Sequence, residues 1–543
     1  MRPYAAMIIV LGLVVAGCLQ DAEEPTTPAE GERGSLNALP LAADAGGSSG
    51  VTDAQVAAAW NDDGTLDLVV PLDVVLFGFD AEAAKQLQDR FAVPYGPQHI
   101  TVSLARTFGI GGSNDESTPD TPGLQQVQVQ VHVAPQQEVE AYRAAVMDSD
   151  GWDGNAAEAW MDGRLAAWGL DDGPLPALVL VHGGDEGHLY RIDFQNGHWE
   201  TSRAMGGSSD GLLMDLAAAV DPYAGEERPY MTPTAEDDVD ALEEAIQDAV
   251  RFRLLQGPIY PLPLPACHAV TLVYAVYVGS EAGAFSSITA DEALNETLLH
   301  DSFVELTNET VHLDVVRLDL PVDDPALWAL LRPSAGDHVA MGLASTVSRE
   351  SAREWIEQNW ETYHVDHEGC EEYLSLLVFS DAAEAFAYGI AEYDPGSSHR
   401  YSFSQVPEMF RGMYEPGLAP TPICCKSDSV DRFEFVNMLF SHETGHLFGQ
   451  AHPHNAIDRT DDNTRWTFST TRTVMSYLVD ERDVSFGTID QVNWHRNRAL
   501  YYAEALQAEG LRDAAIGEGF LNRLAEGDWQ GANGVAQGLL GHA

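Results

Sequence analysis

One short run, residues 442–452, constrains the fold of this chain more than any other feature, and it reads HETGHLFGQAH. His442 and His446 are four residues apart, so on a helix their imidazoles lie on one face, about 6 Å apart, where both can bind one metal ion. Gly449 lets the chain leave that helix in a conformation that other residues resist, which brings His452 round as a third nitrogen ligand. Three protein ligands plus water are typical of a catalytic Zn2+ site, not of a closed structural one.

Glu443 directly follows the first histidine and points to the open side of the metal, where it can take a proton from a metal-bound water. The alternative is a buried helix whose histidines bind no metal. That alternative requires five specified residues to occur at these spacings by accident, a chance on the order of 10⁻⁴ for a chain of this length. The run therefore predicts a catalytic zinc site with Glu443 as the general base.

The run resembles the long zinc signature of the metzincin metallopeptidases, which also have a methionine turn beneath the metal. Here residues 473–477 read TVMSY, and Met475 lies 23 residues beyond His452. By this resemblance Met475 is the apolar floor under the zinc, and Tyr477 matches the tyrosine that stabilises the oxyanion in astacin-like and serralysin-like members. Pro453 and the Met-Ser-Tyr turn bring the chain closest to the serralysin branch, but the calcium-binding glycine-rich repeats usual downstream are absent.

The resemblance implies an α+β catalytic domain made of a mixed sheet, an active-site helix, the methionine turn and a C-terminal helix. It implies an endopeptidase that hydrolyses peptide bonds of extracellular proteins through a zinc-activated water, with Glu443 as general base. Metzincin substrates pair with an edge strand, for which residues 386–393 are the candidate, with an interior strand as the alternative. Two other functions stay open. One is a catalytically inactive surface-binding protein of the same fold, which the intact Glu443 argues against; the other is a zinc hydrolase that acts on something other than peptide.

The N-terminus predicts export and a lipid anchor. An apolar run over residues 5–17 ends on small residues just before Cys18 and is too short to span a bilayer. Residues 1–17 therefore resemble a lipoprotein signal peptide with Cys18 as the lipidated residue, and an ordinary signal peptide followed by a chance cysteine is the alternative. We expect the mature protein at the extracellular face of the cytoplasmic membrane, in contact with the membrane only through this anchor.

The charge of the chain is strongly negative, because 85 Asp and Glu residues stand against 28 Lys and Arg, a formal charge of -57. Such a surface repels nucleic acid and anionic lipid, so we expect no nucleic-acid partner. The expected partners are the protein or peptide substrates of the peptidase, and a monomer is expected. Lysine occurs only at Lys85 and Lys426. An acidic surface with so little lysine is the usage of halophilic archaea, where salt screens the self-repulsion; an acidic protein from an ordinary microbe is the alternative.

The length of 543 residues exceeds that of one ordinary domain. Residues 18–50 are rich in Pro, Thr, Glu, Gly and Ser and predict a flexible acidic linker. Residues 51–260 predict an α/β domain that serves as a propeptide, an inhibitor module or a substrate-recruiting domain. Prolines punctuate the start of the metzincin-like region, residues 261–510, and a C-terminal tail, residues 511–543, is expected to be loose from Ala525 onward.

Hydrophobic periodicity and turn signals locate the main elements. In the first domain strands are expected at 66–79, 127–133 and 177–181, the last paired with 190–194, and helices at 82–90, 138–147 and 156–168. In the second domain strands are expected at 268–278, 311–318 and 373–379, and helices at 349–360, 431–447 and 489–506. The helix at 431–447 carries apolar residues all along and is expected to be mostly buried.

Besides Cys18 the chain has four cysteines, Cys267, Cys370, Cys424 and Cys425, which allow two disulfides in three pairings. Adjacent cysteines rarely pair with each other, so the simplest expectation joins Cys424 and Cys425 to the two distant cysteines. Cys370 also lies close in sequence to two histidines, His364 and His367, which could form a second metal site with it. An exposed loop that contains a disulfide cysteine is the favoured interpretation of this cluster.

Overall fold

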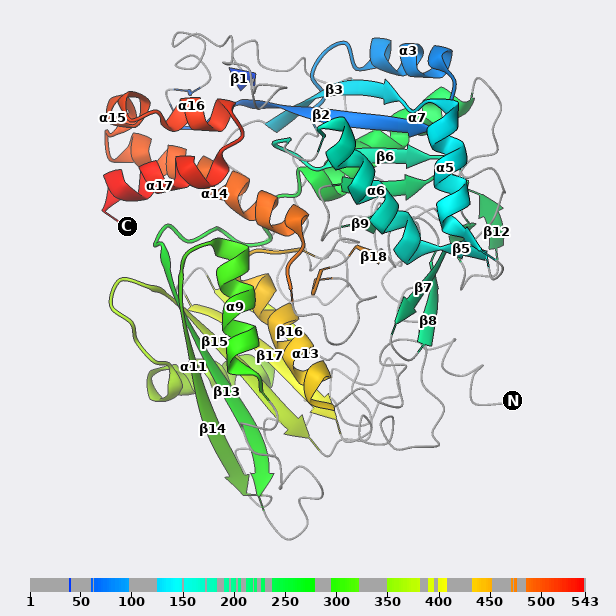
Figure 1. The fold of residues 1–543 in the computed structure, drawn as a ribbon. Coiled ribbons are helices and arrows are strands. Elements are labelled where there is room, and N and C mark those ends of the chain that lie inside the picture. Colours follow the sequence, from blue (N-terminus) through cyan, green and yellow to red (C-terminus); the bar gives the residue numbers. More distant parts are fainter. Residues whose placement is uncertain are drawn as a thin grey trace, which may run out of the picture.

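The computed structural model describes residues 39–40, 60–61, 63–96, 125–148, 151–170, 173–182, 190–194, 197–201, 204–206, 211–217, 219–221, 226–229, 237–278, 294–321, 349–380, 389–394, 399–407, 432–451, 470–471, 473–475 and 485–541. They form an N-terminal unit and a second unit, each built around its own sheet, and helices from the C-terminal end of the chain lie against both (Figure 1). None of the helices in these ranges is both long and apolar enough to cross a membrane.

The N-terminal unit is built on a sheet whose four central strands are parallel. In spatial order these are β3 (Gln125–Val133), β2 (Leu68–Phe77), β6 (Ala177–Val181) and β10 (Gly211–Asp215). β1 (Leu39–Pro40) pairs with the start of β2, and β9 (Ala204–Gly206) runs antiparallel to β10. The last strand, β18 (Thr470–Thr471), comes from a distant part of the chain and pairs parallel to β9.

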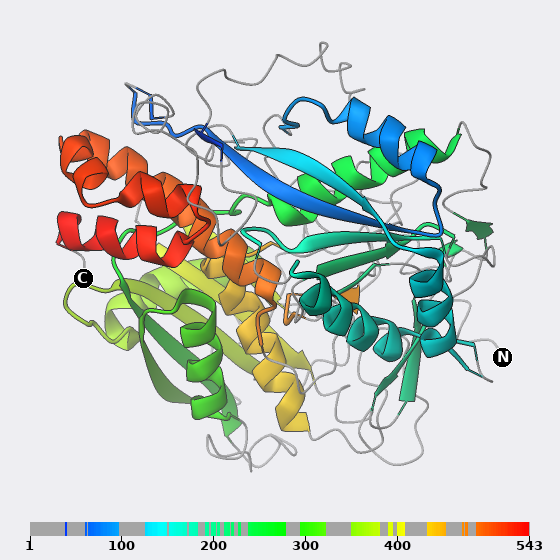
Figure 2. The same cartoon turned by 45° about the horizontal axis from the view of Figure 1, so that its top comes forward.

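Helices cover both faces of this sheet (Figure 2). α3 (Ala81–Arg90) and α7 (Asp237–Ala249) pack on the face that contains Val74, and α5 (Gln136–Val146) and α6 (Gly154–Trp168) pack on the face that contains Val75. Successive residues of a strand point to opposite faces, so a continuous apolar run such as that of β2 fills both cores. The α/β architecture expected for this part of the chain is therefore confirmed.

A smaller sheet of β4 (Met147–Asp148), β5 (Gly151–Asp153), β7 (Tyr190–Phe194) and β8 (Gly197–Thr201) lies beside the main one, and β11 (Ala219–Asp221) pairs with β12 (Glu226–Pro229). The expected pairing of 190–194 with 177–181 is wrong. β6 already pairs with β2 on one side and β10 on the other, so both of its hydrogen-bonding edges are occupied. β7 pairs instead with β5 and β8.

The second unit is a five-stranded mixed sheet in the order β14 (Thr310–Pro321), β13 (Cys267–Val278), β15 (Glu371–Ser380), β17 (His399–Pro407) and β16 (Gly389–Asp394). All neighbours are parallel except β16, which runs antiparallel to β17. The candidate strand at 386–393 is therefore found as β16, at the edge of the sheet among the described strands, and the interior alternative is wrong. β17 was not expected from the sequence.

Two helices cover one face of this sheet and a third covers the other. α9 (Glu296–Thr307) and α13 (Arg432–Leu447) share a core that includes Phe303, Phe440 and Tyr274. α11 (Arg349–Tyr363) packs Ile356 and Trp360 against the opposite face. α13 is the expected helix at 431–447, and the described side chains of its second half are almost all buried, as expected.

The C-terminal end of the chain is helical, in contrast to the loose tail expected there. α14 (Thr488–Ala508) is followed by α15 (Arg512–Gly517), α16 (Phe520–Ala525) and α17 (Trp529–Leu540). The loose tail was expected because this segment is rich in glycine. Its residues Trp529, Ala532 and Ala536, however, recur at helical spacing and are buried. They belong to the same core as Leu68 and Val70 of β2.

Two buried arginines of α14 connect the two units. Arg496 donates to Gln125 Oε1 over 2.6 Å and to Leu254 O over 2.7 Å, both in the N-terminal unit, and burial lowers its pKa to about 9. Arg498, two residues further on, donates to Glu309 of the second unit and, over 2.6 Å, to the carbonyl of Pro265. Side chains of α14 therefore hydrogen-bond to both units and join them.

A disulfide joins Cys267 to Cys370, so the expectation that each of these pairs with Cys424 or Cys425 is wrong. The reason is the register of the sheet. β13 and β15 are parallel neighbours, and His268 of β13 lies opposite Glu371 of β15. Cys267 and Cys370 each come one residue earlier in the chain, so they also lie side by side, with their Cα atoms 4.4 Å apart. Cys424 and Cys425 lie outside the described residues.

Candidate active site

The zinc-motif residues of α13 lie in the buried part of the helix. His442, Glu443 and His446 have exposed fractions of 7%, 6% and 4%. Burial lowers the pKa of His442 to about 4, and a metal ligand must be the neutral imidazole. His452 lies just outside the described residues, one position beyond Ala451, and Cys18 and Tyr477 also lie outside them.

The two histidine rings are held edge to face, with ring centroids 5.0 Å apart and planes at 88°. Nδ1 of His442 lies 2.6 Å from the carbonyl oxygen of Val474, and Nδ1 of His446 lies 2.7 Å from that of Gln450. A carbonyl oxygen can only accept, so each Nδ1 must carry the proton. This tautomer leaves the lone pair on Nε2, and a backbone carbonyl on the other ring nitrogen is the usual support of a metal-binding histidine.

The turn that ends α13 places one of these carbonyls. Gly449 has a φ of +80°, which glycine adopts without strain, so the expected exit from the helix is confirmed. The amide of Gln450 donates to Gly445 O over 3.0 Å and that of Gly449 to His446 O over 2.8 Å, the pair of bonds that defines a Schellman turn. The reversed chain then brings the Gln450 carbonyl back to the ring of His446.

Met475 packs against the turn of α13 that carries the two histidines. A methyl group at Gly445 would lie 2.6 Å from Met475 Sδ and 2.8 Å from Phe486 Cε1, so only glycine lets these side chains reach the helix backbone. Met475 and Phe486 are both buried. The sequence resemblance assigned Met475 to the floor of the site, and the structure brings it against the same helical turn as His442 and His446.

We expect Gly445→Ala to destabilise the protein by about 1–3 kcal/mol, because the new methyl group would overlap Met475 and Phe486 in a filled core. Gly534→Ala is the matched control, since a methyl group at this helical glycine of α17 would meet nothing within 4 Å. The control should be neutral or gain up to about 1 kcal/mol. Urea unfolding measures both variants. Equal stability of the two would show that Met475 does not pack closely under α13.

Glu443 is a buried carboxyl group next to the first histidine. Burial raises its pKa to about 8, and a bound dication would oppose this shift by favouring the carboxylate. A carboxyl group whose pKa has moved toward neutrality can both accept and return a proton near pH 7. Its environment therefore suits a general base.

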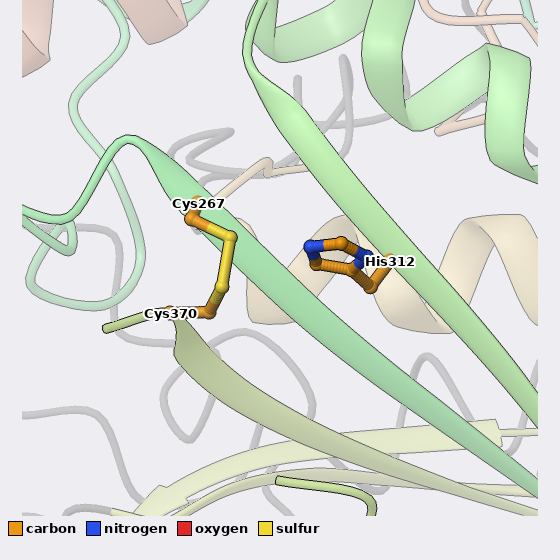
Figure 3. Close-up of side chains that lie close together, drawn as sticks. All are labelled: Cys267, His312 and Cys370. Atoms are coloured by element: carbon orange, nitrogen blue, oxygen red, sulfur yellow. A yellow bond between two sulfur atoms is a disulfide. The ribbon is translucent and has the colours of Figure 1, made fainter. Parts of the chain in front are cut away.

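A second group of metal-binding residue types, Cys267, His312 and Cys370, has its ligand atoms within 4.8 Å of one another (Figure 3). The two sulfur atoms are bonded to each other, so this group offers no thiolate to a metal. The histidines near Cys370 have other partners. His367 Nε2 lies 2.7 Å from Asp314 Oδ2, and His364 Nδ1 donates to Trp360 O over 2.8 Å. The disulfide interpretation of this cluster is therefore confirmed, and the second metal site is not formed by these residues.

The sequence did not identify the groups that orient the histidines. The Val474 and Gln450 carbonyls are backbone atoms, which every residue has, so no residue type marks them. Gly449 and the nearby TVMSY segment were the only signals for where they would lie.

Comparisons with known proteins add no relatives that could assign the site. No protein-family model matches the chain, and no curated protein matches it.

Proposed function

We propose that this protein is a zinc-dependent endopeptidase of the metzincin type. The observation that supports this most directly is the pair His442 and His446, whose Nδ1 atoms are both engaged by carbonyl oxygens, so that both Nε2 atoms carry the lone pair a metal needs. The burial of Glu443 beside them and the packing of Met475 under the same turn support the same function.

His442, His446 and His452 are the residues that would hold the metal, and three nitrogen ligands fit zinc. When bound, zinc supplies a Lewis acid and a water of lowered pKa. Glu443 takes the proton of the attacking water and passes it to the leaving amine. Tyr477, assigned by resemblance, donates a hydrogen bond to the oxyanion of the tetrahedral intermediate.

We propose that the substrate is an extended peptide that pairs with β16. The position of β16 at the edge of the sheet and its antiparallel direction suit strand addition. The hydroxyl of Tyr260 donates to Ala391 O over 2.7 Å, so the substrate would pair with backbone groups of β16 other than this carbonyl. Extracellular proteins are the expected substrates, and the acidic chain is expected to act as a monomer without nucleic-acid partners.

We also propose export and anchoring by a lipid on Cys18, on the strength of the sequence of residues 1–18. The mature chain would then work at the extracellular face of the cytoplasmic membrane. Its surplus of acidic residues suits a salt-rich environment of the kind that halophilic archaea inhabit.

The proposal is tested by casein zymography of the purified protein with and without a zinc chelator. We expect a clearing zone that the chelator removes and added Zn2+ restores, since the activity needs the metal. A protein that binds zinc but clears no casein at any salt concentration would favour the surface-binding alternative or a hydrolase of another substrate. Clearing that resists the chelator would contradict the zinc mechanism.

A further inference from the structure

We propose that the N-terminal unit is a permanent part of the metal site, and that its Arg253 is a positioning residue that orients His442 through Asp490 and the methionine turn. The consequence for catalysis rests on the proposed function, whereas the structural relay does not. Arg253 lies in η1 (Val250–Leu254), the last helical turn of the N-terminal unit. Among the described residues its side chain pairs with Asp490 and not with His442, Glu443 or His446, so it acts through others.

The first step is a buried ion pair. Arg253 Nη1 lies 2.9 Å from Asp490 Oδ1, and both side chains are only 1% exposed. The other oxygen of the same carboxylate, Oδ2, accepts a hydrogen bond of 3.0 Å from the amide of Gly487 and so closes the N-terminus of α14. Arg253 therefore holds in place the side chain that fixes where α14 begins.

The second step leads from the start of α14 to the methionine turn. The carbonyl of Ser485, two residues before Gly487, accepts from the amide of Val474 over 2.8 Å. Phe486, between them, packs against Gly445 of α13 together with Met475. The position of α14 thus sets the position of residues 473–475.

The third step reaches the metal ligand. The carbonyl of Val474 accepts from Nδ1 of His442 over 2.6 Å. Val474 is thus held by Ser485 through its amide and binds His442 through its carbonyl. The second hydrogen bond fixes both the rotation and the tautomer of the imidazole. A shift of Val474 would tilt the ring or release its Nδ1 proton.

A second anchor on the other side of the turn comes from the same unit. Thr470 and Thr471 form β18, which pairs with β9 at Met205 and Gly206 (Figure 1). β18 ends two residues before Thr473. The methionine turn is therefore attached to the N-terminal unit both before residue 473 and, through Asp490, after residue 485.

This arrangement argues against a propeptide that is removed on activation. Removal of the N-terminal unit would take away the ion-pair partner of the Asp490 carboxylate and the strand with which β18 pairs. It would also expose the core that Leu500 and Leu521 share with β2. We infer instead that the N-terminal unit stays in place and supports the methionine turn through Asp490 and β18.

The test compares Arg253→Met with Arg496→Met. Both variants remove a buried arginine that joins α14 to the N-terminal unit, but Arg496 contacts Gln125 and backbone carbonyls and takes no part in the relay to Val474. Arg253→Lys keeps the charge and serves as the rescue variant. Two quantities are measured: amide hydrogen exchange of Val474 and Gly487 in the metal-free protein, and the dissociation constant for Zn2+.

For Arg253→Met we expect exchange at Val474 and Gly487 to speed up about tenfold or more, and the zinc dissociation constant to rise about 10- to 100-fold. Arg496→Met should change neither by more than about threefold, and Arg253→Lys should restore most of both. Equal effects of the two methionine variants, or no effect of Arg253→Met, would overturn the relay.

If Arg253→Met does not fold, Asp490→Asn replaces it, since the amide keeps an oxygen for Gly487 but loses the charge, and the same two changes are expected. The exchange measurement uses no metal and no substrate. A wild-type protein that binds no zinc would therefore refute the proposed function, while the exchange rates would still decide the relay.

Discussion

Glu443→Ala will abolish peptide hydrolysis and leave the zinc content of the protein unchanged, whereas His446→Ala will lose both. Glu443 is not among the proposed ligands, so its removal should leave the two imidazoles and their carbonyl partners in place. The same change removes the proposed general base, which would accept the proton of the attacking water, and such a group contributes about 10²- to 10⁴-fold in rate. Removal of His446 takes away one of three expected ligands, and two are too few to retain zinc against dialysis.

Zinc per protein chain is measured by elemental analysis after dialysis, and activity by the initial rate of casein hydrolysis. Glu443→Gln is the matched control, because it keeps the size of the buried side chain but cannot take the proton. It should be as inactive as Glu443→Ala and fully loaded with zinc. Equal zinc content in the Glu443→Ala and His446→Ala variants would contradict the assignment of ligand and base.

Loss of the Cys267–Cys370 disulfide will lower the free energy of unfolding by about 4–5 kcal/mol. The bond spans 103 residues along the chain, including α9, β14 and α11. Without it, the unfolded chain regains the freedom of a very long loop, and the entropic gain grows with loop length. The double variant Cys267→Ser with Cys370→Ser is compared with the oxidised wild type by urea unfolding.

The reduced wild-type protein is the control for the double variant. It should unfold at the same urea concentration as the double variant, because both lack only the cross-link. A loss of less than about 1 kcal/mol in both would mean that the loop is already held together in the unfolded state. Zinc content should stay unchanged in the double variant, since neither cysteine belongs to the proposed ligand set.

Most individual elements could be predicted from the sequence because their patterns are local. β2 is a continuous apolar run, β3 alternates Val with Gln, and α13 is apolar along its length. The predictions were wrong where the structure of a segment depends on its tertiary partners. Residues 190–194 are a strand as expected, but the choice of β5 over β6 depends on which edges are already filled. The helices α15 to α17 are short and contain several glycines, and packing on the core of the N-terminal unit stabilises them.

In the candidate site, too, the local features could be predicted from the sequence and the tertiary contacts could not. The spacing of His442 and His446 and the choice of glycine at position 449 predicted two ligands on one helical face and a sharp exit from the helix, since a helix has a fixed period and only glycine adopts a positive φ without strain. The placement of Tyr477 and His452 stays a prediction. The tertiary structure alone decided which carbonyls hold the rings, how deeply Glu443 is buried and which cysteines pair.

The tertiary structure also decided that the N-terminal unit contacts the start of α14, through Arg253, and that its strand β9 pairs with β18. The physical reason is distance along the chain. Residues within one helical turn constrain each other directly, so their arrangement can be inferred from the sequence. Arg253 and Asp490 are 237 positions apart, and only the packing of two complete sheets and a shared helix brings them together.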